Sequence, residues 1–442
     1  MSIKENCKMK EKRKICLACG HALSGEVLMT LSDMPASAQD IPLPEELSED
    51  HGITLDLCRC PHCGLVQFDC EPVDYYRDVI RAVGLSETMR NLRRSDYRHM
   101  IDTYGLSGAR FIECGCGRGE FMEVLKEFPA EIYATEANEA FAAAAGERLG
   151  EGCHVLNCFP DDCGMKLPGA PFDCFFSFNF LEHQIDPSGM LGAMYANLRS
   201  GGYGLITVPS FEYILKEGRY YELIRDHIAN YSLDTLIRLC EDCGFRVLEK
   251  GMIGIGDTLR VVVQKPQADT LSNTVHAACT EIFRAFSAER ESRQAGQPCH
   301  KTNGENGPVS ASGSPECDIS PLLQNYDSMR AGMKDYVERL KAAGLSLSLF
   351  GAGHQGFTIA ATTALSGYAE YIMDSALFKQ GRFAPASHIP IVSPDHFAAH
   401  PTDVIMITAP GYVREITELL REKYKDRPEL KICSIEPESW IL

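Results

Sequence analysis

Short runs of apolar residues alternate with helix-like segments along most of the chain. From Ala109 onward, seven such runs predict β-strands: ARFIEC, EIYATE, CHVLNC, FDCFFSF, YGLITV, FRVLEK and LRVVVQ. Closer to the C-terminus, the helical segment MRAGMKDYVERLKAAG precedes three further runs: LSLSLF, AEYIMD and DVIMIT. Because strands that alternate with helices are typical of mostly parallel sheets, we expect an α/β fold that is built twice along the chain.

Changes in composition divide the chain into four segments. Its 442 residues exceed the roughly 250 to 300 that a single core accommodates. Cysteine pairs mark residues 1–75 as a small module, and residues 76–266 contain a helical lead-in and the first α/β domain. Residues 267–319 are expected to form a helix and a flexible linker rich in glycine, serine and proline. Residues 320–442 form the second α/β domain in this prediction.

The charge balance narrows the choice of partners. The chain has 61 acidic and 43 basic residues, a formal net charge of -18. Nonspecific nucleic-acid binding depends on clustered lysine and arginine, so we expect no nucleic-acid partner. No apolar run approaches the roughly 20 residues of a membrane helix, and the basic start lacks the apolar core of a signal peptide. We therefore expect no membrane contact and a cytoplasmic location.

Cysteines are concentrated near the N-terminus, where seven of the 19 lie within the first 70 residues. Cys16 and Cys19 form one CxxC pair, and Cys60 and Cys63 form a second. Two such pairs suit four thiolates around a tetrahedral zinc ion, which would be structural because no coordination position stays open. Cys58 remains a competing ligand, since CRCPHC offers two starting cysteines, and free thiols remain the alternative.

A glycine-rich turn follows the first predicted strand, in the sequence FIECGCGRGEF. Gly115, Gly117 and Gly119 allow a tight turn and bring bare backbone amides against a ligand. About 20 residues later the next strand ends in Glu136, a position that commonly binds both hydroxyls of a ribose. The turn reads ExGxGxG rather than GxGxxG, so S-adenosylmethionine, a ligand without phosphates, fits better than a dinucleotide. Glu113 would then lie near its methionine amino group; the alternative is a glycine turn beside a solvated acid.

Polar residues also follow the buried strand FDCFFSF, at the sheet edge where ligands bind in α/β proteins. Asn179, a candidate cofactor-binding residue, and His183 occupy these positions, and the alternative for the histidine is a capping role on a surface turn. The segment 220–236 concentrates Tyr221, Asp226 and His227 between two predicted strands, where an isolated histidine is more often structural.

Several motifs together resemble those of the bacterial sugar C-methyltransferases. The resemblance covers nearly the whole chain except the stretch near 289–318. Its most specific parts are the cysteine pairs with CGLVQF, ECGCGRGEF, LEH at 181–183, GAGHQG at 351–356, and MDSALFKQGRFAPASHIPI at 373–391, which is similar to the family motif D-x4-KQGR-x2-P. It implies a zinc-binding N-terminal module, a central class I Rossmann-like methyltransferase domain, and a second Rossmann-like C-methyltransferase domain.

The resemblance also implies a reaction. Family members methylate carbon next to a ketone in nucleotide-linked deoxysugars, through an enolate formed by a base. It implies His227 as the base, Asp226 as the group that orients it, and His183 as the group that polarises the ketone, with Tyr221 as another candidate base. Methylation of oxygen or nitrogen on another small molecule remains open, and so does a noncatalytic scaffold.

The family's YHEH sequence corresponds here to residues 224–227, in which only the acidic character and the last histidine are kept. The altered position Arg225 is a candidate partner for a substrate carboxylate or phosphate. Tyr76, or its neighbour Tyr75, is a loose equivalent of a family tyrosine, and Tyr76 is the candidate for binding substrate. His354, within GAGHQG, is expected to face the sugar nucleotide, although that motif alone would suggest a dinucleotide site. Lys379 and Arg382 are candidate phosphate contacts; the alternative is an exposed basic turn.

Overall fold

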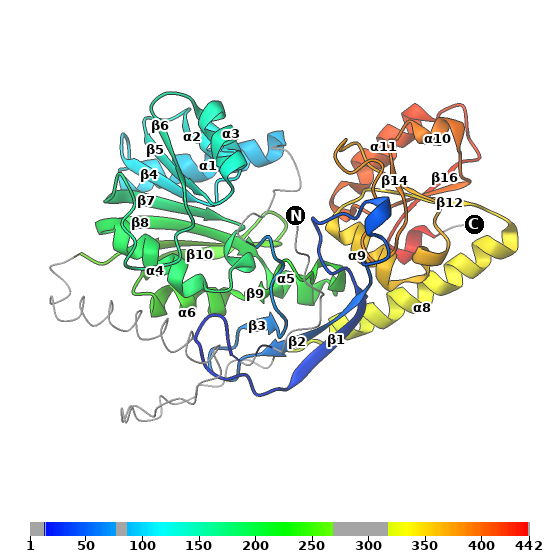
Figure 1. Cartoon of the computed structure of the whole chain (residues 1–442), viewed down its shortest axis with the longest axis horizontal. Helices are drawn as coiled ribbons and strands as arrows, with labels where there is room; N and C mark the ends of the chain where they lie inside the picture. The colour runs from blue at the N-terminus through cyan, green and yellow to red at the C-terminus, as the bar shows by residue number, and fades with distance from the viewer. Residues whose placement is uncertain (1–12, 14, 77–85, 268–316, 441–442) are drawn as a thin grey trace. The chain divides into compact units, whose positions relative to one another are not determined.

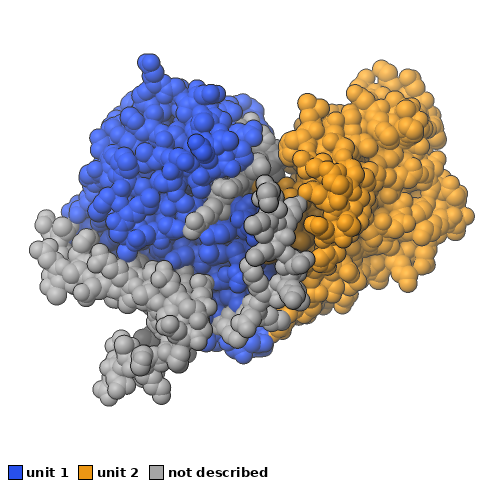
Figure 2. All heavy atoms as spheres, viewed as in Figure 1, with its two compact units in different colours: residues 1–26, 58–213, 228–317 blue, residues 27–57, 214–227, 318–442 orange. Residues whose placement is uncertain are grey.

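The computed structural model describes residues 13, 15–76, 86–267 and 317–440, and the chain divides into two compact units (Figure 2). Unit 1 comprises residues 1–26, 58–213 and 228–317, and unit 2 comprises residues 27–57, 214–227 and 318–442. The predicted helix after residue 267 and most of the predicted linker lie outside the described residues. The predicted domain boundaries stay a prediction.

A seven-stranded sheet forms the centre of unit 1 (Figure 1). Its order is β10 (Arg246–Ile253), β11 (Thr258–Gln264), β8 (Leu198–Pro209), β7 (Phe172–Phe178), β4 (Arg110–Cys114), β5 (Glu131–Glu136) and β6 (Cys153–Asn157). All neighbours are parallel except that β11 runs antiparallel to both β8 and β10. All seven strands predicted from Ala109 onward are confirmed.

Helices cover this sheet because its strands are apolar on both faces. The helices of unit 1 are α1 (Glu87–Tyr104), α2 (Glu120–Leu125), α3 (Glu139–Leu149), α4 (Pro187–Asn197) and α6 (Leu233–Asp242). Buried side chains of α1, α2 and α3, such as Tyr97, Met122 and Leu149, form one core with Phe111 and Phe176 of the sheet. In Figure 1, α4 and α6 lie on the opposite side of the sheet from α1, α2 and α3.

The helical lead-in is confirmed for α1, and its ends have clear local causes. The Ser86 side chain caps the helix by accepting the backbone N–H of Met89 at 3.2 Å. Gly105 ends it with a φ of 65°, in the left-handed region that glycine adopts without steric cost. Residues 77–85 of the predicted lead-in lie outside the described residues.

A short antiparallel ladder joins β3 (Val66–Phe68) to β9 (Ala229–Asn230) in unit 1. The side chain of Gln67 in β3 is fully buried; it accepts the backbone N–H of Leu17 at 2.8 Å and donates to the carbonyl of Ile15 at 3.3 Å. This amide therefore fixes the first cysteine loop against the second.

Unit 2 contains a five-stranded parallel sheet. Its order is β14 (Ile391–Val392), β13 (Ile372–Met373), β12 (Leu347–Phe350), β15 (Val404–Ile407) and β16 (Lys431–Ser434). In chain order, the α-helices between residues 318 and 440 are α8 (Ser320–Ala343), α9 (His354–Thr362), α10 (His396–Ala399) and α11 (Val413–Lys423). The runs LSLSLF, AEYIMD and DVIMIT each contain one of these strands, so the second strand series is confirmed.

Shorter elements complete the described chain. They are β1 (Val27–Met34), β2 (Ile53–Arg59), α5 (Phe211–Lys216), and the 3-10 turns η1 (Pro44–Glu46), η2 (Leu181–His183), η3 (Tyr220–Glu222), η5 (Ala364–Gly367), η6 (Pro410–Tyr412) and η7 (Pro437–Ser439). Within unit 2, Tyr220 of η3 is fully buried and its hydroxyl lies 3.0 Å from the Thr362 hydroxyl at the end of α9. The segment 214–227 is thereby packed onto the C-terminal sheet domain.

Candidate active site

The glycine-rich turn lies between β4 and α2, at the carboxyl end of the sheet. Gly115, Gly117 and Gly119 all have positive φ values, of 67°, 58° and 78°. A Cβ atom at position 115 would lie 2.6 Å from the ring of Phe180, closer than any real contact. The sequence therefore needs glycine here for both conformation and space.

Glu136 ends the neighbouring strand β5 and holds this turn in place. Its Oε2 accepts the backbone N–H of Gly117 at 2.8 Å, and its Oε1 accepts that of Asn138 at 2.9 Å. Each carboxylate oxygen can accept a second hydrogen bond, so the group can still bind both hydroxyls of a ribose. Glu113, at the end of β4, is fully buried beside the same turn. These residues fit S-adenosylmethionine, for which they were predicted.

Two aromatic side chains near the turn, Phe159 and Phe180, were not predicted from the sequence. The ring of Phe180 lies 6.0 Å from that of Phe159, and Phe159 lies 6.3 Å from Tyr76 in an edge-on arrangement. Phe180 is also the side chain that closes over Gly115. Tyr76, predicted as a substrate residue, is thereby connected to the cofactor turn through two apolar rings. The signal in the sequence is weak, because an isolated phenylalanine usually belongs to a core.

The end of β7 carries the next group of polar residues. Asn179 is exposed, has a φ of 48°, and accepts a hydrogen bond from the Thr207 hydroxyl at 2.9 Å. Glu182 and His183 follow in η2 and are both buried, with His183 Nε2 3.9 Å from Glu182 Oε1. Burial raises the pKa of Glu182 to about 8, and its Oε2 has no hydrogen-bond partner among the described residues. A carboxyl in this state is protonated at neutral pH and can donate a hydrogen bond.

The other predicted catalytic residues belong to unit 2, in the segment that follows α5. Tyr221 and Asp226 are buried, whereas Arg225 and His227 are partly exposed. The Asp226 carboxylate accepts the backbone N–H of Ala38 at 3.0 Å, and the Arg225 guanidinium donates to the carbonyl of Ala36 at 3.1 Å. These bonds attach the segment to the loop that follows β1.

The structure brings His227 and His354 together, with ring centroids 6.2 Å apart. His354 is the first residue of α9, and its Nε2 lies 3.3 Å from Glu222 Oε2. The neighbouring Gln355 amide donates to the other oxygen of Glu222 at 2.6 Å. Burial alone would raise the pKa of Glu222, but the hydrogen bonds from His354 and Gln355 lower it. Glu222 was not predicted, because it precedes residues 224–227, which match the family motif, although the neighbouring Tyr221 was a candidate.

The D-x4-KQGR segment supports the GAGHQG turn through contacts of its side chains with the backbone of that turn. Lys379 is buried, and its ammonium donates to the carbonyl of Ala352 at 2.7 Å and lies 3.4 Å from Asp374. Asp374 also accepts the backbone N–H of Ala352 at 2.9 Å. Arg382 donates to the carbonyl of Ile41 at 2.8 Å. The segment is therefore not an exposed basic turn at Lys379, although a phosphate contact stays a prediction.

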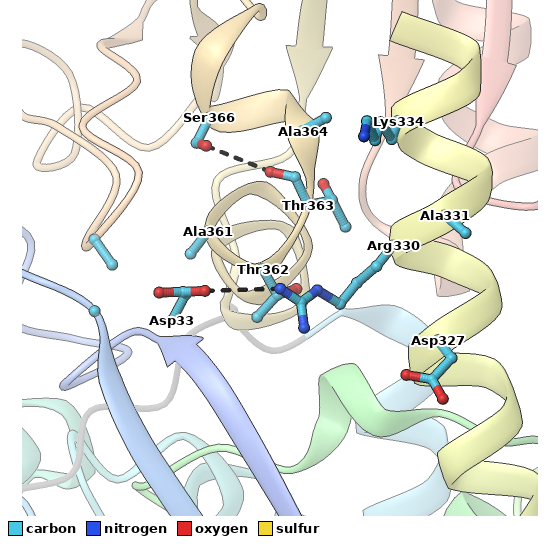
Figure 3. Close-up of a pocket in the computed structure, with 12 residues that line it drawn as sticks. Asp33, Asp327, Arg330, Ala331, Lys334, Ala361, Thr362, Thr363, Ala364 and Ser366 are labelled. Carbon is cyan, nitrogen blue, oxygen red and sulfur yellow. Dashed lines mark hydrogen bonds and ion pairs between the residues drawn. The ribbon is translucent and has the colours of Figure 1, made fainter.

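An open cavity of about 630 Å³ lies in unit 2 next to α8 and α9 (Figure 3). Arg330 of α8 approaches Asp33 of β1 at 3.9 Å within it, and the hydroxyls of Thr362 and Thr363 lie close by. The lining contains two basic and two acidic residues. With its charges balanced and no predicted site residue in its wall, this cavity receives no functional assignment.

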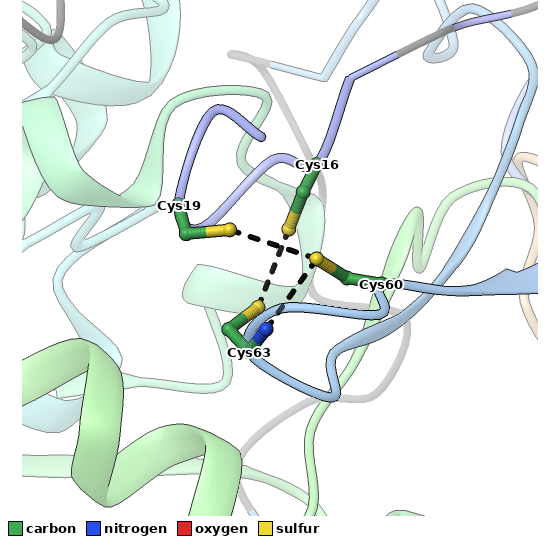
Figure 4. A group of neighbouring side chains, drawn as sticks. All are labelled: Cys16, Cys19, Cys60 and Cys63. Atoms are coloured by element: carbon green, nitrogen blue, oxygen red, sulfur yellow. Dashed lines mark hydrogen bonds between the residues drawn. The ribbon is translucent and has the colours of Figure 1, made fainter. Parts of the chain in front are cut away.

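The two cysteine pairs converge on one point (Figure 4). Cys16 Sγ lies 3.5 Å from Cys63 Sγ, and Cys19 Sγ lies 3.6 Å from Cys60 Sγ. A tetrahedron with zinc–sulfur bonds of about 2.3 Å has sulfur–sulfur edges of about 3.8 Å, so the four thiols fit a zinc ion. All four are buried, and Cys58 is not a member of this group.

The loops that carry the four cysteines have the same backbone pattern. The amide of Gly20 donates to the carbonyl of Cys16, and that of Gly64 to the carbonyl of Cys60, both at 3.0 Å. The hydroxyl of Ser188 at the start of α4 donates to the carbonyl of Ala18 at 2.8 Å. The cysteine loops are thus packed directly on the main sheet domain of unit 1.

Two family models match separate parts of the chain. Residues 86–250 match the family model described as a methyltransferase domain, and residues 321–430 match the C-methyltransferase C-terminal domain. The chain is 23% identical over 419 residues to C-methyltransferase NovU of Streptomyces niveus, with 92% of each chain covered.

Two solved structures are similar to part of this chain. One is a SAM-dependent methyltransferase from Aquifex aeolicus, 20% identical, covering 40% of this chain and 92% of that one with a TM-score of 0.33. The other is magnesium protoporphyrin IX methyltransferase from Synechocystis with bound SAH, 14% identical, covering 43% and 93% with a TM-score of 0.34.

The protein is an S-adenosylmethionine-dependent methyltransferase. Its central domain has the class I Rossmann-like α/β fold, with the glycine turn after the first strand and the acid at the end of the second. None of the helices in the described part of the chain combines the length and apolar character that a bilayer crossing demands.

Proposed function

We propose that this methyltransferase transfers the methyl group to a carbon next to a ketone in a nucleotide-linked deoxysugar. The observation that carries the proposal is the approach of His354 to His227, with ring centroids 6.2 Å apart. It joins the segment that matches the C-methyltransferase C-terminal domain to the segment in which the base is predicted. The NovU relative, a C-methyltransferase by name, supports the same chemistry.

His227 acts as the base in this proposal. Its imidazole takes the proton from the carbon next to the ketone, and the electron pair of that C–H bond forms the double bond of an enolate. Histidine suits this task because its ordinary pKa lies near neutral pH. Glu113, Glu136 and the glycine turn would hold S-adenosylmethionine, which when bound would supply the methyl group: the enolate carbon would form the new C–C bond as the sulfonium S–CH3 bond breaks, with S-adenosylhomocysteine as the leaving group. The proton on His227 then passes to solvent.

Two further groups assist the base within unit 2. Glu222 holds His354 by a hydrogen bond, and His354 in turn faces His227. Asp226 positions His227 through the chain, since its carboxylate fixes the segment to the backbone of Ala38. Tyr221 is the alternative base if His227 does not take the proton.

His183 polarises the ketone oxygen as negative charge develops on it. The protonated Glu182 beside it adds a neutral hydrogen-bond donor at this edge of the sheet. Tyr76 and Arg225 contribute to the acceptor site. Lys379 and Arg382 serve the nucleotide phosphates, Lys379 mainly by holding the turn at Ala352.

The four-cysteine group is proposed to hold one structural zinc ion. Sixteen cysteines of the described residues are thiols, which is typical of a protein that works in a reducing compartment such as the cytoplasm. With four thiolate ligands the ion has no open position and takes no part in methyl transfer.

The reaction itself provides the test. The protein is incubated with methyl-labelled (carbon-13) S-adenosylmethionine and a panel of nucleoside-diphosphate keto-deoxysugars, and products are analysed by mass spectrometry and carbon NMR. We expect a labelled methyl group bonded to carbon next to the ketone. A label bonded to oxygen or nitrogen would contradict the proposal and favour the other enzymatic alternative. Failure to bind S-adenosylmethionine in calorimetry would favour a scaffold.

A further inference from the structure

Two histidines stack at the surface beside the four-cysteine group. His21 directly follows the first cysteine loop, and His62 lies inside the second. Both side chains are exposed, yet their ring centroids are only 3.7 Å apart and their planes differ by 7°. Aromatic rings prefer offset or edge-on arrangements with centroids about 4.5 to 7 Å apart, so attraction between the rings does not explain this geometry.

The ligand atoms of the two histidines converge with a third. One nitrogen of His21, one of His62 and the Sγ of Cys19 all lie within 4.8 Å of one another. His21 Nδ1 lies 3.1 Å from the carbonyl of Cys19. A hydrogen bond from Nδ1–H to that carbonyl leaves the Nε2 lone pair of His21 available for a metal ion. A metal-binding histidine usually donates its other ring N–H to a carbonyl or carboxylate in this way.

The charges around the pair are balanced rather than repulsive. Arg238 of α6 donates to the carbonyl of His62 at 2.8 Å and lies 3.4 Å from its Nδ1. The same guanidinium lies 3.7 Å from Asp242 on the next turn of the helix. The Asp242 carboxylate therefore offsets the charge of Arg238 beside the histidine pair.

We propose that His21, His62 and the Cys19 thiolate form a second zinc site that shares one sulfur with the four-cysteine centre. Two imidazoles and a thiolate are ligands that a borderline metal ion such as Zn²⁺ prefers. Three protein ligands leave one position for water, and both imidazoles are exposed. This second ion therefore exchanges with solution, whereas the ion within four buried thiolates does not.

The test uses the whole zinc-loaded protein and zinc alone as the probe. Equilibrium dialysis with elemental analysis should show one zinc that survives gel filtration and one further equivalent that binds reversibly. The double variant His21→Gln/His62→Gln should keep the first and lose the second, with at least a tenfold loss of affinity. The matched control His51→Gln/His400→Gln removes two exposed histidines elsewhere and should bind both equivalents.

A spectroscopic measurement separates a specific site from general surface binding. Cobalt(II) added to the zinc-loaded protein should give the absorption of a tetrahedral ion with a thiolate ligand, in the wild type and the control but not in the double variant. A second equivalent that persists in the double variant, or is absent from the wild type, would overturn the proposal. A protein that holds no zinc at all would instead refute the four-cysteine assignment, and elemental analysis distinguishes the two results.

Discussion

The carboxylate of Glu136 accepts the backbone N–H of Gly117 at 2.8 Å. The acid that ends the second central strand is thus bonded directly to the turn that follows the first. Because these strands are parallel neighbours, their carboxyl ends lie at the same edge of the sheet. The acid predicted to bind the ribose therefore also shapes the loop that approaches the rest of the ligand.

Replacing Glu136 by glutamine should weaken S-adenosylmethionine binding by about 10-fold to 100-fold, because a hydrogen bond to a charged group contributes about 1.5 to 3 kcal/mol. Calorimetric titration of the purified variant measures the loss. Glu147→Gln, on the exposed face of α3, is the matched control and should bind like the wild type. Equal affinity in the two variants would remove Glu136 from the cofactor site.

Valine at position 117 should abolish S-adenosylmethionine binding. Gly117 has a φ of 58°, which a β-branched residue adopts only with strain, and the new side chain would stand where the ligand needs bare backbone. Gly146→Ala serves as the control, because a Cβ atom there meets open space in α3. If Gly117→Val is folded by circular dichroism and binds with unchanged affinity, the turn does not contact the ligand.

Serine at position 60 should abolish binding of the proposed zinc ion and lower the thermal midpoint of the protein. Cys60 Sγ faces Cys19 Sγ at 3.6 Å, and hydroxyl oxygen is a much weaker zinc ligand than thiolate. Elemental analysis of freshly prepared protein measures the metal. Cys58→Ser is the matched comparison. The sequence left Cys58 open as an alternative zinc ligand, and we expect this variant to keep its zinc. Full zinc content in Cys60→Ser would defeat the assignment.

The stability of the protein should fall as pH rises between about 4.5 and 8 through the titration of Glu182. Its pKa is raised by burial to about 8 in the folded state, against about 4.3 when unfolded. Within this window the folded state holds one more proton than the unfolded state, so each rise in pH favours unfolding. Glu182→Gln replaces the carboxyl with an amide that does not titrate, and so removes this contribution to the pH dependence.

Thermal midpoints of both proteins at several pH values provide the measurement. We expect the wild type to lose stability relative to Glu182→Gln from about pH 5 to about pH 8, and the difference to level off above that. Parallel curves for the two proteins would show that Glu182 does not titrate in this window. The comparison is independent of catalysis, so it needs no substrate.

Asparagine at position 227 should lower turnover by roughly a hundredfold or more, as lost general base catalysis does, while S-adenosylmethionine binding stays unchanged. Exchange of the substrate's α proton with heavy water, followed by NMR, isolates the base from the methyl transfer. The exchange should be lost in His227→Asn. If it continues at the normal rate, the base is His183 or Tyr221 instead.

The sequence by itself determined the helices and strands, and it indicated S-adenosylmethionine as the methyl donor. Strand runs such as FDCFFSF and the turn FIECGCGRGEF are local, since apolar periodicity and positive φ at glycine depend on neighbouring residues alone. Two CxxC pairs indicated four zinc-binding thiolates, because the spacing within each pair already brings two metal ligands close together. The structure brings these four sulfurs together, as expected.

Only the tertiary structure decided which residues from distant segments meet. Glu222 contacts His354 across 132 positions of sequence, and Phe180 closes over Gly115 from the loop between β7 and η2; neither residue carries a local signal of its own. The protonated state of Glu182 depends on burial by surrounding elements, and Lys379 became a buried support because Ala352 and Asp374 surround its ammonium. Contacts and desolvation of this kind arise from packing between elements, which the pattern along one chain does not contain.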